Sequence, residues 1–72
     1  MTMDSDALTA AHSRYEAAYD AYRMCTQRVA EKLRKGLLPS AEETAEEIAA
    51  SERLVAMRRD LFDVIAILGQ SH

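Results

Sequence analysis

The fold is decided by residues 35–43, KGLLPSAEE, near the middle of a chain of 72 residues. Gly36 suits the left-handed conformation that often ends a helix, and Pro39 cannot continue one. Ser40 and Glu43 have the capping-box spacing that begins a helix. We therefore expect one helix to end here and another to begin after a turn of roughly four residues, so that the two lie antiparallel.

The N-terminal half predicts a long helix over about residues 4–35, because apolar or small residues recur at alternating spacings of three and four. Asp4 or Ser5 is expected to cap its start. Lys32, Arg34 and Lys35 lie in its last turn, where cations offset the helix dipole. The stripe, which continues at spacings of four, consists of Leu8, Ala11, Tyr15, Ala18, Tyr22, Cys25, Val29, Leu33 and Leu37.

The C-terminal half predicts a second helix over about residues 41–68, with Gly69 directly after its last turn. Two apolar stripes run along this helix. The stripe that we expect to face the first helix consists of Ile48, Val55, Phe62 and Ile65. The other, on a neighbouring face at heptad spacing, consists of Leu54, Met57, Leu61, Val64 and Leu68.

The pairing of the two helices is predicted from size and charge. One register sets Val29 against Ile48, Tyr22 against Val55, Tyr15 against Phe62 and Ala11 near Ile65. The same register brings the basic end of the first helix beside the acidic start of the second. The charged residues concerned are Arg28, Lys32, Arg34 and Lys35 on one side and Glu42, Glu43, Glu46 and Glu47 on the other.

The second stripe predicts association, because a helix that is apolar over so wide an arc is normally buried on both sides. A chain this short also buries too little in a two-helix contact to be stable without a disulfide, a metal or a second copy. We expect one all-α domain over residues 1–72 that dimerises into a four-helix bundle of coiled-coil type. Its interface between copies is predicted at Leu54, Met57, Leu61, Val64 and Leu68, which pack on each other or on the small residues Ala10, Ala17 and Ala21 with Met24.

Composition narrows the function classes. The net charge of −3 disfavours nucleic acid as a partner. No apolar run is long enough to cross a membrane, and the acidic N-terminus lacks the apolar segment of a secretory signal. The single cysteine, Cys25, lies on the apolar stripe and suits a reducing compartment. We expect a complete, cytoplasmic protein, and the excess of arginine over lysine hints at a bacterial source.

Motifs of catalysis, metal binding or cofactor binding are not found, so we expect no metal and no cofactor. His12 and Glu16 are spaced by one turn but offer two ligands without a third. In the predicted register Arg58 and Arg59 lie beside Asp20 and Glu16, which favours ion pairs across the hairpin or across a dimer. The tyrosines Tyr15, Tyr19 and Tyr22 are expected to pack in the bundle, with an aromatic groove for a partner helix as the alternative.

These patterns favour a small non-enzymatic protein-interaction module, a homodimeric helical bundle that binds a helical protein partner. The alternative is a small-ligand or enzymatic site formed between subunits around Arg58, Arg59 and the tyrosine cluster, since charged cavities of helical bundles can bind acidic metabolites.

Overall fold

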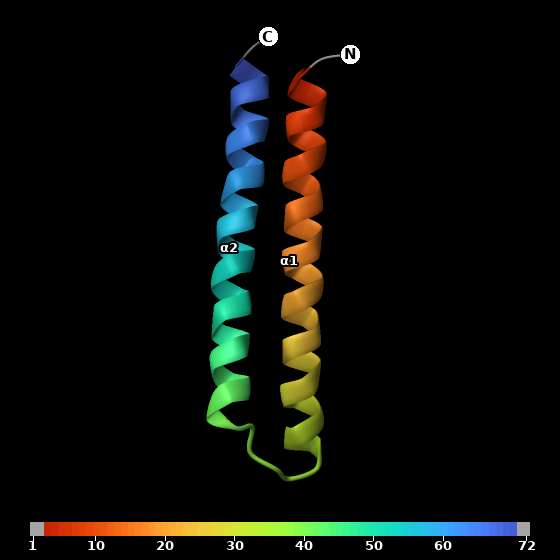
Figure 1. Ribbon diagram of the computed structural model, residues 1–72, viewed down its shortest axis with the longest axis vertical. Helices are drawn as coiled ribbons and strands as arrows, with labels where there is room; N and C mark the ends of the chain where they lie inside the picture. Colours follow the sequence, from red (N-terminus) through yellow and green to blue (C-terminus); the bar gives the residue numbers. More distant parts are fainter. Residues whose placement is uncertain (1–2, 71–72) are drawn as a thin grey trace.

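The computed structural model describes the backbone of residues 3–70 and the side chains of residues 6–70. It consists of two helices, α1 (Met3–Arg34) and α2 (Ala41–Gln70), which lie side by side and antiparallel (Figure 1). The hairpin is 54 Å long and 17 × 16 Å across, so it is a rod only two helices wide. The predicted all-α hairpin is confirmed.

The turn follows the predicted chemistry at both of its ends. Gly36 has φ +75°, and its N–H donates to the Leu33 carbonyl at 3.0 Å while the Leu37 N–H donates to the Lys32 carbonyl at 2.9 Å. These two bonds form a Schellman motif, which satisfies carbonyls at the end of α1. The connection between the helices covers residues 35–40 and is longer than the roughly four residues expected.

The capping box at the start of α2 is confirmed in both directions. The Glu43 N–H donates to the Ser40 hydroxyl at 3.0 Å, and the Ser40 N–H donates to a Glu43 carboxylate oxygen at 2.9 Å. The far end of α2 differs from the prediction, because the helix runs through Gly69 to Gln70 and Gly69 has no positive φ. A glycine near the last turn of a helix costs about 1 kcal/mol or less and need not end it.

At the other end of the hairpin α1 already begins at Met3, so Asp4 and Ser5 lie within the helix rather than before it. Their predicted role as caps rests on side chains that lie outside the described residues.

The predicted stripe of α1 does face α2. Ala11 and Ala18, at 0% and 2% exposed, are the most buried residues among those that the structure describes. The last two members of the stripe, Leu33 and Leu37, are more than half exposed. Spacings of four advance the stripe around a straight helix, which carries Leu33 away from α2. The confirmed members, buried or half-buried, are Leu8, Ala11, Tyr15, Ala18, Tyr22, Cys25 and Val29.

The two stripes of α2 are exchanged relative to the prediction. Half-buried positions on α2 include Leu54, Met57, Leu61, Val64 and Leu68. The stripe that was expected to face α1 is instead 46–60% exposed, and it consists of Ile48, Val55, Phe62 and Ile65. The prediction that the stripe of Ile48, Val55, Phe62 and Ile65 forms the hairpin contact is therefore wrong.

The exchange follows from a register that is shifted by about one helical turn. Tyr22 lines a groove with Ile48 and Ser51 rather than facing Val55. Near the chain termini, His12 lines a groove with Leu61. This register sets Leu61 about level with Ala11 and Leu54 about level with Ala18. Leucines of α2 thus pack over the alanines of α1, where the two helices can approach closely.

The charge pairing between the helices is confirmed at two positions. Arg28 forms an ion pair with Glu46 at 3.1 Å, and Lys32 forms one with Glu43. The other two cations predicted for this contact, Arg34 and Lys35, pair with Glu31 of their own helix instead. The acidic first turn of α2 thus meets the basic last turns of α1, where both charges also offset the helix dipoles.

Candidate interaction surface

One long face of the hairpin is apolar and aromatic. We call it the aromatic face and define it as Tyr15, Tyr19, Tyr22, Ile48, Val55, Phe62 and Ile65. At about 100° per residue these side chains lie on the same flank of the contact between α1 and α2. Two grooves along this flank confirm the placement, since one joins Tyr22 to Ile48 and the other joins Leu8 and His12 to Ile65.

The tyrosines do not form the single cluster predicted from their spacing. The rings of Tyr15 and Tyr19 lie 6.3 Å apart at an angle of 46°. They line one groove together with His12, Glu16 and Asp20. Tyr22 lies farther along, in the groove that it shares with Ile48 and Ser51.

The arginines are placed differently from the prediction. The guanidinium carbon of Arg58 lies 5.5 Å from the centre of the Phe62 ring, within the range of a cation–π contact. Among the described side chains, neither Arg58 nor Arg59 forms an ion pair, so the predicted pairs with Asp20 and Glu16 are not made within the hairpin. The charged residues that line the groove beside Tyr15 include the acidic Glu16 and Asp20 but neither arginine.

Groups that could carry chemistry are dispersed over the molecule. His12 Nδ1 lies 3.3 Å from Glu16 on the surface of α1. Cys25 is half-buried, and its Sγ lies 4.0 Å from the Glu46 carbonyl oxygen. Within residues 6–70 no three His, Cys, Asp or Glu side chains gather in a way that could hold a metal ion.

The glutamates at the start of α2 have a structural role. Hydrogen bonds from Lys32 and from the Ser40 N–H lower the pKa of Glu43 from 4.5 to about 2. Its side chain is only 16% exposed, so the carboxylate is held between the end of α1 and the first turn of α2. Glu46 is engaged by Arg28 in the same way. Both carboxylates thus fasten the hairpin at its turn.

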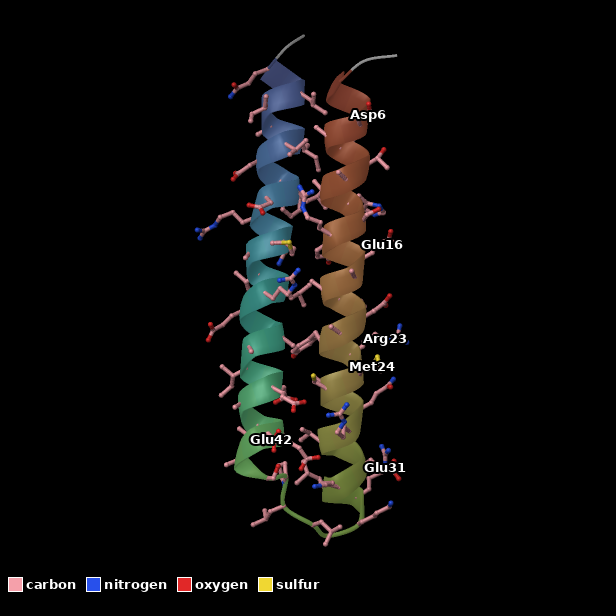
Figure 2. All side chains as sticks on the ribbon, in the orientation of Figure 1. Asp6, Glu16, Arg23, Met24, Glu31 and Glu42 are labelled. Carbon is pink, nitrogen blue, oxygen red and sulfur yellow. The ribbon has the colours of Figure 1, made fainter. Side chains whose placement is uncertain are left out.

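The opposite face of the hairpin is small and polar. It carries the Arg28–Glu46 ion pair and the exposed alanines Ala10, Ala17 and Ala21. Among the described side chains of α1 on this face, Met24 is the large apolar one, at 62% exposed, and it projects away from α2 (Figure 2). On α2 the same face carries Ile67, which is also 62% exposed. The two faces therefore differ in composition, and the aromatic face carries more of the large exposed apolar side chains than the opposite face does.

The hairpin exposes more surface than a compact protein of its mass. Its accessible surface is 5581 Å², whereas a folded monomer of 8.0 kDa is expected to expose about 4,500 Å². The excess of about 1,100 Å² is comparable to the area of about 800 Å² that each partner contributes to a standard interface.

The aromatic face was not predicted from the sequence as a free surface. The signal was present, because Ile48, Val55 and Phe62 repeat at intervals of seven, and Val55 and Phe62 directly follow Leu54 and Leu61 of the other stripe. A helix with two such stripes, offset by one residue, is normally covered by two neighbouring helices. Spacing alone does not show which stripe packs on which neighbour.

Comparison of the chain with known protein families, with curated proteins and with solved structures found no significant match. Neither helix, over the residues that the structure describes, has a stretch that is long and apolar enough to cross a lipid bilayer.

Proposed function

We propose that this chain is a non-enzymatic protein-interaction module that forms a homodimer, in which two hairpins pack through their aromatic faces into a four-helix bundle. The observation that carries the proposal is the aromatic face itself. Side chains at heptad spacing along α2, flanked by tyrosines of α1, are about half exposed although they are as apolar as a protein core. Water contact with such a surface is unfavourable in proportion to its area.

A second copy of the chain matches this surface in the spacing of its side chains and in the area that it would cover. The aromatic face extends from Ile48 to Ile65, roughly 26 Å along the rod, and is spaced for helix packing. Each hairpin carries the same face. The excess of about 1,100 Å² that the whole hairpin exposes is also enough for a standard interface. The stripe from Leu54 to Leu68, first predicted as the interface, remains untested in that role. Because α1 already half-covers it, it offers less area to a second chain.

The proposed bundle presents to other proteins the opposite face, with Ala10, Ala17 and Ala21, and the loop around Leu38, which is 86% exposed. An interaction module of this kind works by shape and charge rather than by chemistry. Binding of a helical protein partner belongs to the proposal and would use the surfaces that remain outside the dimer.

Sedimentation velocity and light scattering on the intact chain test the dimer. We expect a species of twice 8.0 kDa at micromolar concentration. A lysine in place of Val55 should convert it to monomer, since a charge would be buried in the interface. Met24→Lys is the matched control and should leave the mass unchanged. A folded wild-type monomer at micromolar concentration would refute the proposal.

A further inference from the structure

We propose that the two copies of the dimer are related by a two-fold axis parallel to the helices, so that α2 of each copy packs on α1 of the other. This inference rests on the proposed dimer and adds its geometry. Two ion pairs would be made twice in this arrangement, between Glu16 of one copy and Arg59 of the other, and between Arg23 of one copy and Glu52 of the other.

The first observation is the order of charges along the two edges of the aromatic face. On α1, Glu16 and Arg23 are separated by seven residues, and both project away from α2 (Figure 2). On α2, Glu52 and Arg59 are also separated by seven residues, and both are exposed. Glu16 borders the tyrosine groove and Glu52 borders the Tyr22 groove, so both edges adjoin the aromatic face.

The second observation is that these charges are available. Among the described side chains, Arg23, Glu52 and Arg59 form no ion pair, and Glu16 contacts only the exposed His12. Within one hairpin the two edges lie on opposite sides of the face. A second chain is needed to bring one edge onto the other.

The third observation is the level of each charge along the rod. The groove-sharing residues, His12 with Leu61 and Tyr22 with Ser51, set Glu16 about level with Met57 and Arg23 about level with Ala50. Arg59 and Glu52 therefore lie about two residues, or roughly 3 Å, from the levels of their proposed partners. A two-fold axis along the rod keeps every level unchanged, so both pairs come within reach together.

The same placement brings apolar side chains of one copy opposite apolar side chains of the other. In this register Tyr19 lies about one residue from the level of Val55, and His12 lies about one residue from the level of Phe62. Each copy therefore sets a ring of α1 over a stripe residue of α2 from its partner. Large residues fill the space between the layers along the length of the face.

The competing arrangement has its two-fold axis across the rod, with α1 on α1 and α2 on α2. Near the middle of the rod it would set Glu16 of one copy opposite Asp20 of the other, twice, and these like charges repel. It would still allow Glu52 to approach Arg58 or Arg59. The arrangement with α1 on α2 pairs acids with bases along both helices, which is why we favour it.

Disulfide trapping tests the geometry in the full chain with Cys25→Ser as background. We expect a mixture of Tyr19→Cys and Val55→Cys proteins to give a crosslink between the two variants, and each variant alone to give none. Crosslinks of each variant with itself would support the competing arrangement and overturn this one. A dimer that gives no crosslink in the mixture would also overturn it.

Charge exchange provides a second measurement that does not remove apolar contacts. Arg59→Glu should raise the dimer dissociation constant about 3- to 10-fold, because two exposed pairs are lost and repulsion replaces them. Adding Glu16→Arg to the same chain should restore the constant to within about twofold. Arg53→Glu, on the other side of α2, is the matched control and should have little effect.

The outcomes separate the geometry from the proposed function. A dimer without rescue in the double variant would overturn the geometry and leave the dimer standing. A wild-type chain that is monomeric in both measurements would overturn both.

Discussion

Replacing Phe62 by alanine should strongly weaken the proposed dimer. Phe62 is 53% exposed in the single hairpin, and a phenylalanine or similar aromatic side chain buries roughly 200 Å² when it is fully covered. About 100 Å² per chain thus remains for the second copy to cover, which corresponds to about 2.5 kcal/mol at 25 cal/mol per Å². A dimer has two such residues, so full coverage would contribute up to about 5 kcal/mol and half coverage about 2.5 kcal/mol.

The expected result is a dissociation constant raised between about 50-fold and a few thousand-fold. Sedimentation equilibrium over a range of chain concentrations measures it, with circular dichroism to confirm that the variant remains helical. Met24→Ala is the matched control, because Met24 is more exposed than Phe62 but lies on the opposite face. A change of less than about twofold for Phe62→Ala, or an equal loss for Met24→Ala, would refute the assignment of the aromatic face as the interface.

Three further changes probe the hairpin itself. Because the pKa of Glu43 is lowered to about 2, its carboxylate stabilises the folded chain above the unfolded value of 4.5, and this stabilisation is lost as the pH falls toward 2. Glu43→Gln should therefore flatten acid-induced unfolding between about pH 5 and 2. An unchanged pH profile would contradict this. Gly36→Ala should lower the free energy of unfolding by about 1–2 kcal/mol in urea titrations, since alanine is strained at φ +75°, whereas Gly69→Ala should not destabilise α2. Ala18→Leu should cost about 1–3 kcal/mol by forcing the helices apart, and a stabilised variant would show that the contact has room.

Local signals in the sequence were enough to place the helices and the turn. The glycine at the left-handed position and the Ser40–Glu43 box depend on residues within a few positions of one another, so their geometry follows from short-range chemistry. The stripe of α1 was equally clear, because that helix has one apolar stripe of regular spacing. The end of α2 was less predictable, since Gly69 is compatible both with a last helical turn and with a cap.

The register and the choice between the two stripes of α2 could not be read in the same way. Both stripes have heptad spacing, and matching large residues with large ones favoured Tyr22 against Val55. The structure instead sets leucines of α2 over Ala11 and Ala18, because closer backbones give more contact per residue than two large side chains held apart. A shift of one turn keeps Lys32 and Arg28 beside glutamates of α2, so the charge pattern did not distinguish the registers.

The arrangement of stripes links the stability of the hairpin to the proposed function. Since Ala11 and Ala18 are the most buried of the described residues, the contact between α1 and α2 contributes little apolar burial per residue ordered. The same small residues that let the helices approach leave the tyrosines on one flank, together with the stripe of Ile48, Val55, Phe62 and Ile65. In the proposed dimer, covering that flank would stabilise the hairpin. Folding and association would then be parts of one equilibrium, with the dimer interface as the second half of the core.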